Sequence, residues 1–387
     1  MSTPVLETKL PRVGTTIFAT MSELATQVKA VNLGQGFPDF DCDPALIDHV
    51  NQAMRDGHNQ YPPMPGVMPL RQAVSDKIAS LYGKRYDPAS DITITAGATQ
   101  AIINAVIATV RPGDEVLVLE PCYDSYQPNI EMVGGTVVRV PLDPGSFRPN
   151  FAAIANALSP KTRLMILNTP HNPSGTVWTD DEMRQLEALL ARTNTLLVSD
   201  EVYEHMAFAP HVHRSAASYP GLAERTFVVS SFGKTYHVTG WKVPYCAAPA
   251  ALTAEYRKVH QFNVFTVNSP MQHGIARYMA NPEPYLGLSA FYQRKRDAFR
   301  AGLAKTQFEL LPCEGTYFQS VRIDGLGVPE KNLSESDFCY WLTREIGVAA
   351  IPMSTFYADG FDQRVIRFCF AKKEETLRTA LERLSRL

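Results

Sequence analysis

The most informative segment of the chain is SFGKTYHVTGWKV, residues 231–243. It follows an apolar, β-branched run at 226–229 that we expect to form a strand. Its Gly-Lys-Thr triplet invites comparison with a phosphate-binding P-loop, which requires a glycine five residues before Gly233. That position is Val228, inside the expected strand, so the spacing argues against a P-loop.

Strand-length apolar runs recur on both sides of this segment and alternate with stretches of helical spacing. The clearest example is a strand at 92–95, a turn at 97–99 and a buried helix at 100–110. Such alternation is typical of a parallel sheet with crossover helices, so we predict an α/β fold. The sheet should have about seven strands, the others lying at 115–119, 136–140, 164–167, 196–199, 226–229 and 243–247.

The pattern changes near the C-terminal end, where strands mix with helices in a smaller α+β arrangement. We therefore expect a large domain at 46–284 and a small domain at 285–387. Residues 1–45, which are rich in glycine and proline after Asn32, are expected to join the small domain.

Composition excludes several classes of protein. The 387 residues are 45% hydrophobic and 20% charged, which is the ordinary composition of a globular protein. The net charge of −2 offers no excess of positive charge to bind nucleic acid. The six cysteines form no C-x-x-C pair, so we expect neither a zinc site nor disulfides, and a cytoplasmic location. We expect no signal peptide and no membrane span.

Seven further segments accompany residues 231–243 in a fixed order. They are VNLGQGFPDF (31–40), NQYPPMPGVMPLR (59–71), TAGATQA (95–101), EPCYDSYQP (120–128), LNTPHNPSG (167–175), SDEVYEH (199–205) and VIRFCFA (365–371). Together these segments resemble the class I/II aminotransferases of fold type I, which use pyridoxal 5'-phosphate (PLP). The resemblance covers nearly the whole chain and implies the PLP-dependent transferase fold and a homodimer with shared active sites.

Lys234 matches the lysine that binds PLP covalently in this family. A lysine can do so only when its amine loses a proton, which burial and nearby positive charge promote. Asp200 would pair with the pyridine nitrogen, although a residue at a strand end could equally cap a helix or lie in a loop. Tyr203 and Asn172 would reach the phenolic oxygen of PLP, while a turn role is the alternative for Asn172.

The cofactor's phosphate needs donors without bulk. Gly97, Ala98 and Thr99 lie between a strand and a helix start, where free N–H groups and the helix dipole favour a dianion. The resemblance adds Ser231, Lys242 and, from the partner subunit, Tyr61, for which simple packing is the alternative. Lys242 replaces the family's commoner arginine, which keeps the charge but loses the planar fork.

The remaining site residues concern the substrate and the ring. Arg367, flanked by apolar residues, would clamp the substrate carboxylate, with a structural ion pair as the alternative. Gly36 would let its backbone approach the same carboxylate. Tyr123 would stack on the cofactor ring. Pro244 departs from the family's small residue, and we expect a sheet edge or a bulge there.

Within the family the chain is most similar to methionine aminotransferases and to kynurenine and glutamine transaminases. An apolar pocket of Phe18, Tyr61, Tyr123 and Phe265 would suit methionine or phenylalanine, although such aromatics are more often core residues. The resemblance implies ping-pong transfer to a 2-oxo acid through a pyridoxamine phosphate form of the enzyme. A cysteine-S-conjugate (cystathionine) β-lyase and a non-catalytic PLP-fold protein remain alternatives.

Overall fold

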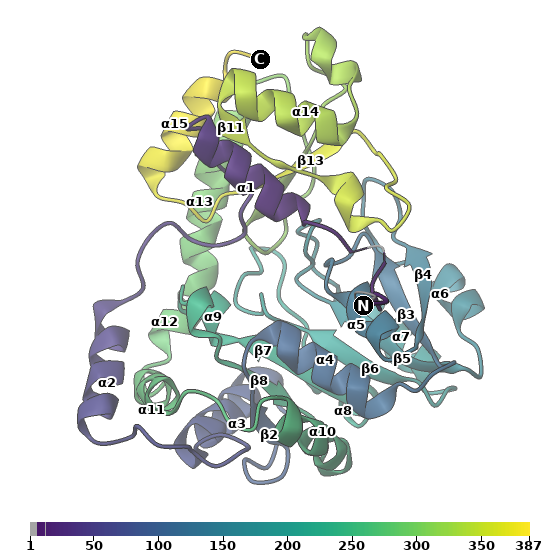
Figure 1. Ribbon diagram of the computed structural model, residues 1–387, viewed down its shortest axis with the longest axis vertical. Coiled ribbons are helices and arrows are strands. Elements are labelled where there is room, and N and C mark those ends of the chain that lie inside the picture. Colours follow the sequence, from purple (N-terminus) through teal and green to yellow (C-terminus); the bar gives the residue numbers. More distant parts are fainter. Residues whose placement is uncertain (1–5, 12) are drawn as a thin grey trace, which may run out of the picture.

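The computed structural model describes residues 6–11 and 13–387, which form two lobes (Figure 1). Within these residues the larger sheet has seven strands in the order β2-β8-β7-β6-β5-β3-β4. The strands are β2 (Ile92–Ile94), β3 (Glu115–Glu120), β4 (Thr136–Pro141), β5 (Thr162–Asn168), β6 (Leu196–Asp200), β7 (Thr226–Ser231) and β8 (Pro244–Ala247). Strand β8 alone runs opposite to the other six strands of this sheet. The predicted α/β class and mostly parallel sheet are confirmed.

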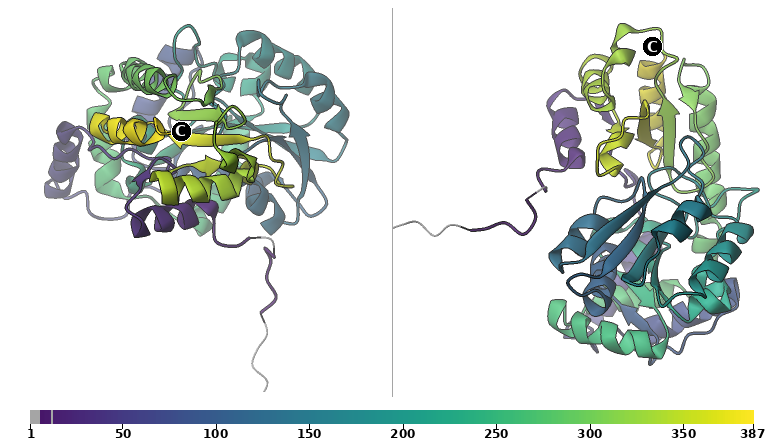
Figure 2. Two further views of the ribbon diagram at one scale, coloured as in Figure 1. Left: turned by 90° about the horizontal axis from the view of Figure 1, so that it is seen from above. Right: turned by 90° about the vertical axis from the view of Figure 1, so that its right-hand side faces the viewer.

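The inner strands of this sheet are short apolar runs buried on both faces, whereas the edge strand β4 is only partly buried. Residues of β7 and β8 are almost entirely buried, and the right-hand view of Figure 2 shows helices packed around the sheet of the lower lobe. The helices of this lobe are α2 (Pro44–Arg55), α3 (Met68–Tyr82), α4 (Ala98–Thr109), α5 (Tyr126–Met132), α6 (Phe151–Ala157), α7 (Asp180–Leu190), α8 (Pro220–Ala223), α9 (Phe232–Thr235), α10 (Ala250–Asn263) and α11 (Ser269–Tyr278).

The expectation for Pro244 is wrong. The residue begins β8, which lies between β2 and β7, so it is not on a sheet edge. The register between β7 and β8 runs from Val228 opposite Ala247 to Ser231 opposite Pro244 without a shift, so there is no bulge. Proline is tolerated here because it is the first residue of the strand, and its carbonyl still accepts a hydrogen bond from the Thr95 N–H at 3.0 Å.

The upper lobe in Figure 1 carries an antiparallel sheet in the order β12-β13-β10-β9. Its strands are β9 (Glu309–Leu310), β10 (Phe318–Arg322), β12 (Ile351–Pro352) and β13 (Val365–Cys369). The helices around it are α1 (Ile17–Gln27), α13 (Leu288–Leu303), α14 (Glu335–Trp341) and α15 (Glu374–Leu384), while α12 (Glu283–Leu286) lies at the foot of α13 beside the lower lobe.

An N-terminal segment and a C-terminal segment of the described chain pair in this lobe. Strand β1 (Val31–Asn32) pairs in parallel with β11 (Val348–Ala349), and the Cys369 N–H donates to the Leu33 carbonyl at 2.7 Å. These contacts support a division into 1–45, 46–284 and 285–387, which we retain as a proposal. No helix in the described part of the chain is long and apolar enough to cross a membrane.

Candidate functional site

A cavity of about 440 Å³ opens where the carboxyl ends of β5, β6 and β7 face the upper lobe. This is the edge at which parallel sheets bind ligands. Its wall contains most of the predicted site residues: Phe18, Gly36, Gly97, Ala98, Thr99, Tyr123, Asn172, Asp200, Tyr203, Ser231, Lys234, Lys242 and Arg367. Residues far apart in sequence, such as Phe18 and Arg367, thus contribute to one site.

Lys234 lies on α9, the short helix that follows β7. Its Nζ donates to the Tyr317 hydroxyl at 2.9 Å and to the Gly36 carbonyl at 3.3 Å. Burial lowers the pKa of this amine to about 8, with Asp200 opposing the shift and Arg367 adding to it. The amine therefore loses its proton near neutral pH far more readily than a surface lysine does, as a nucleophile or a base must.

Asp200 is the last residue of β6 and is 4% exposed. A turn follows it, so the alternative that it caps a helix is wrong. One carboxylate oxygen, Oδ2, accepts from the Tyr126 hydroxyl at 2.6 Å. Burial raises the pKa of Asp200 to about 6, while the hydrogen bond from Tyr126 opposes the shift. The group is poised to pair with a cationic ligand atom.

The first residues of α4 form a small cradle. Gly97 has φ of +105°, and a Cβ there would lie 2.6 Å from Lys242 Cε and 2.7 Å from its Nζ. The ammonium of Lys242 therefore lies directly over the glycine, beside the N-terminus of a twelve-residue helix. Ser231, at the end of β7, lines the same cavity. Backbone donors, the helix dipole and a cation together suit a phosphate dianion.

Arg367 is on β13 and is 1% exposed. Its Nη1 donates to Asn172 Oδ1 at 2.7 Å, and its guanidinium carbon lies 3.9 Å from the centre of the Phe318 ring. Within the described residues it forms no salt bridge and its Nε has no hydrogen-bond partner, so the alternative of a structural ion pair is not supported. A buried arginine with a free donor is suited to clamp a carboxylate.

Aromatic rings surround the space between these groups. Tyr203 is 4% exposed, and its ring meets that of Tyr317 edge-on at 5.2 Å between centroids. The Tyr123 hydroxyl lies 3.5 Å from Thr99 Oγ1, beside the cradle. Gly36 packs so closely that a Cβ would lie 3.0 Å from the Phe318 ring. Aromatic rings thus line the cavity between its charged groups, which are the carboxylates of Asp124 and Asp200 and the cations of Lys234, Lys242 and Arg367.

Tyr61 and Phe265 do not reach this cavity. Tyr61 is 81% exposed and Phe265 47% exposed, and their rings contact each other at 5.4 Å. Tyr61 lines a separate surface hollow together with Thr266 and neighbouring residues. The structure therefore does not bring these two predicted residues into the site of their own subunit.

Several residues of the site were not among those predicted from the sequence. Tyr317, which holds Lys234, lies in GTYFQSVRI (315–323), within the C-terminal region for which the sequence predicted only a mixture of strands and helices. Tyr126 and Asn168 lie inside quoted segments, EPCYDSYQP and LNTPHNPSG, yet no local pattern shows that their side chains contact Asp200. Asp124, next to Tyr123, also lines the cavity. For Asp124 alone, its position next to the predicted residue Tyr123 was a signal in the sequence.

Comparison with known proteins places the chain among amino-group transferases. The profile described as "Aminotransferase class I and II" matches residues 28–384. "Methionine aminotransferase" of Escherichia coli K12 is 51% identical over 98% of both chains, and a solved E. coli structure described as having a methionine aminotransferase function superposes with a TM-score of 0.97 at 50% identity, covering 100% of both chains.

Other similar proteins are named for different substrates. The solved structure of N-succinyldiaminopimelate aminotransferase from Mycobacterium tuberculosis is 39% identical with a TM-score of 0.93, covering 98% of this chain and 99% of that chain. "Kynurenine--oxoglutarate transaminase 3" of Rattus norvegicus is 33% identical, over 95% of this chain and 87% of the rat protein.

Proposed function

Because the chain belongs to the class I and II aminotransferases, which depend on PLP, we propose that it transfers the amino group of methionine to a 2-oxo acid. The observation that carries this proposal is that Lys234 and Arg367 face one aromatic cavity. The 51% identity to the E. coli methionine enzyme supports methionine as the donor. Dependence on PLP is a property of this family.

The residues present fit PLP. The space over Gly97, which Lys242 occupies with its ammonium, suits the phosphate, and the buried Asp200 carboxylate would pair with the protonated pyridine nitrogen. Tyr203 and Asn172 would donate to the phenolic oxygen. Tyr123 would pack against the ring, and Ser231 and Thr99 would add hydroxyl donors to the phosphate. When bound, PLP supplies an electron sink for bonds to the substrate's α-carbon.

The protein's own groups would then direct the chemistry. Arg367 would bind the substrate carboxylate with two parallel N–H donors, aided by the Asn172 amide and the Gly36 backbone. The Lys234 amine, whose pKa burial lowers to about 8, would take the proton from the substrate's α-carbon. The Tyr317 hydroxyl would hold that amine beside the reacting atoms.

The substrate side chain would extend toward Phe18, whose ring lies 5.6 Å from the guanidinium carbon of Arg367. A thioether is favoured against aromatic rings, which supports methionine and allows aromatic donors. Lys234 and Lys242 are engaged by the cofactor in this proposal. That leaves no second cation among the described residues lining the cavity for a side-chain carboxylate.

We also propose a homodimer with shared active sites in the cytoplasm. Tyr61 and Phe265, which are exposed and contact each other, would enter the partner's cavity, Tyr61 reaching the phosphate. All six cysteines lie in the described residues and are free, which supports a reducing compartment.

The proposal is tested by pairing a panel of amino acids with several 2-oxo acids and measuring oxo-acid formation. Methionine should give the highest kcat/KM, with phenylalanine, glutamine and kynurenine slower. A higher kcat/KM for kynurenine than for methionine would show that kynurenine, not methionine, is the preferred donor. Release of thiol and pyruvate from cystathionine in excess of transamination would instead identify a β-lyase.

A further inference from the structure

Tyr126 joins two parts of the proposed cofactor site. It is the first residue of α5, is 2% exposed, and donates its hydroxyl proton to Asp200 Oδ2 at 2.6 Å. Its ring meets that of Tyr123 edge-on, with centroids 5.7 Å apart. Its backbone N–H donates to the Tyr123 carbonyl at 3.1 Å. One buried residue therefore contacts both the acid and an aromatic ring of the site.

Asp200 depends on this hydroxyl because its other support is weak. Its Oδ1 accepts only a long bond of 3.4 Å from the Val202 N–H, and among the described residues it forms no ion pair. The charge of Lys234 also favours the ionised carboxylate, but from beyond ion-pair distance. A carboxylate removed from water without strong donors or a cation reverts to its neutral form. Tyr126 provides the short hydrogen bond that opposes this change.

The phenol itself stays a donor. Burial and the adjacent Asp200 hold the pKa of Tyr126 well above its ordinary value. Its position is fixed by the helix start and by the packing against Tyr123, so the hydroxyl has little freedom to turn away. The bond therefore occupies Oδ2 and leaves Oδ1 as the freer oxygen of the carboxylate.

We propose that Tyr126 is a positioning residue that keeps Asp200 ionised and presents its freer oxygen to the pyridine nitrogen of PLP. This inference rests on the proposed role of Asp200. A hydrogen bond to a charged group changes an equilibrium by about tenfold or more. Without the Tyr126 hydroxyl the carboxylate becomes more basic, and the proton shared with the ring nitrogen moves toward Asp200.

The test uses the full-length protein reconstituted with PLP labelled with ¹⁵N in the ring. The ¹⁵N chemical shift distinguishes a protonated pyridine from a neutral one. The wild type should show the protonated value, and Tyr126→Phe should shift toward the neutral value. The PLP concentration for half-saturation of the apoenzyme should rise about tenfold in this variant. A resonance and a half-saturation equal to those of the wild type would overturn the inference.

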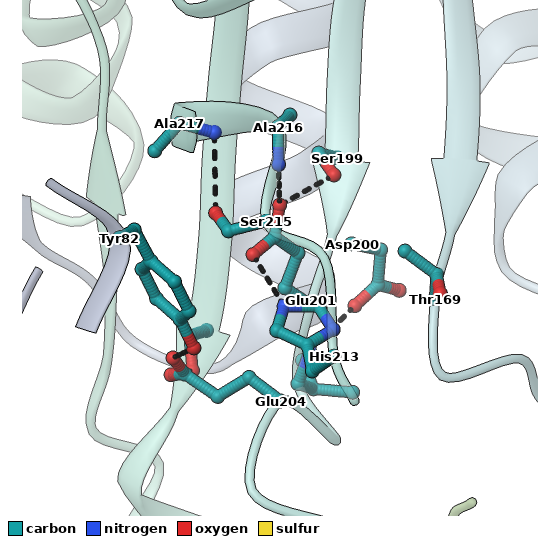
Figure 3. A network of polar contacts seen from close by, with 12 residues as sticks. Tyr82, Thr169, Ser199, Asp200, Glu201, Glu204, His213, Ser215, Ala216 and Ala217 are labelled. Atoms are coloured by element: carbon teal, nitrogen blue, oxygen red, sulfur yellow. Dashed lines mark hydrogen bonds and ion pairs between the residues drawn. The ribbon is translucent and has the colours of Figure 1, made fainter. Parts of the chain in front are cut away.

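A matched control is available in the neighbouring network (Figure 3), where Tyr82 Oη donates to Glu204 Oε2 at 2.6 Å. Tyr82→Phe removes a phenol-carboxylate bond of the same length from an acid that does not line the cavity. It should leave the ¹⁵N shift and the PLP half-saturation unchanged. An equal shift in Tyr82→Phe would contradict the specific role of Tyr126.

Asp200→Asn separates this inference from the function on which it rests. If Asp200 pairs with the ring nitrogen, Asp200→Asn gives the neutral ¹⁵N value, whereas a protonated value would reject that role itself. In the Asp200→Asn background, Tyr126→Phe should cause little further loss of PLP affinity, because the two residues act as one unit. A full additional tenfold loss there would show that Tyr126 acts by packing alone and would overturn the inference.

Discussion

Arg367 and Asn172 are joined by a hydrogen bond of 2.7 Å from Nη1 to Oδ1, which connects β13 of the upper lobe to the loop after β5. The same guanidinium packs on the Phe318 ring at 3.9 Å and keeps its Nε without a partner in the described residues. These contacts hold the Arg367 guanidinium in place and leave N–H groups of it available to bind a substrate.

Replacement of Arg367 by alanine should impair the use of amino acid and oxo acid while PLP stays bound. Losing two charge-assisted hydrogen bonds should lower kcat/KM for methionine at least about 100-fold. Steady-state kinetics and PLP titration check this. Arg296→Ala is the matched control, because Arg296 also packs on a phenylalanine, Phe208, at 4.7 Å but lies outside the cavity. Unchanged kinetics in Arg367→Ala would remove its assigned role.

The cradle at Gly97 predicts a specific effect on cofactor binding. In Gly97→Ala the new Cβ would lie 2.6 Å from Lys242 Cε, so the lysine must leave the phosphate space. We expect the PLP half-saturation to rise on the order of tenfold to a hundredfold, measured by equilibrium dialysis. Gly57→Ala has comparable backbone strain, with φ of +88°, but its Cβ would meet nothing within 4 Å. Equal PLP affinities in the two variants would contradict the cradle.

The buried Lys234 amine predicts a pH-dependent stability of the apoenzyme. Its pKa is lowered from 10.5 to about 8, so the folded state binds fewer protons than the unfolded state between these values. The resulting cost to stability is fully present below about pH 8 and fades as pH rises toward 10.5.

Lys234→Met should therefore make the apoenzyme more stable at pH 7, by up to about 3 kcal/mol. The gain should shrink at pH 9.5, as measured by urea unfolding. Lys258→Met, at a side chain that is 70% exposed, controls for loss of a surface charge. A gain that is the same at both pH values would show that burial of the charge is not its cause.

Subunit mixing tests the shared site. A protomer with Lys234→Ala and a protomer with Tyr61→Ala should each be impaired alone. In a mixed dimer, one site regains both a native Lys234 and the partner-supplied Tyr61. Random mixing should then restore about a quarter of wild-type activity. No recovery in a mixture that size analysis shows to contain dimers would place Tyr61 in its own subunit.

The sheet was predictable because its strands are short buried runs separated by clear turns, and each expected strand is present in the structure. Strand ends also located Asp200 and Ser231, since parallel strands bring their carboxyl ends to one edge. Pro244 was misjudged because a strand's first position tolerates proline, and the sequence does not show which residue comes first.

Contacts between distant segments were beyond the reach of sequence patterns. Tyr317 reaches Lys234 only because the upper lobe folds over the end of β7, 83 residues away along the chain. Tyr126 contacts Asp200 across 74 residues. Such pairs depend on side-chain direction in three dimensions, which helical or strand periodicity does not encode.

The central claim is that Lys234 holds PLP covalently, and borohydride reduction of the holoenzyme followed by peptide mass mapping tests it most directly. We expect a pyridoxyl label on the peptide that contains Lys234 and on no other lysine. We also expect the label to be lost when methionine is added before reduction, because the cofactor then leaves the lysine. A label on Lys242 or on any other lysine, or no bound cofactor at all, would show that Lys234 does not hold PLP.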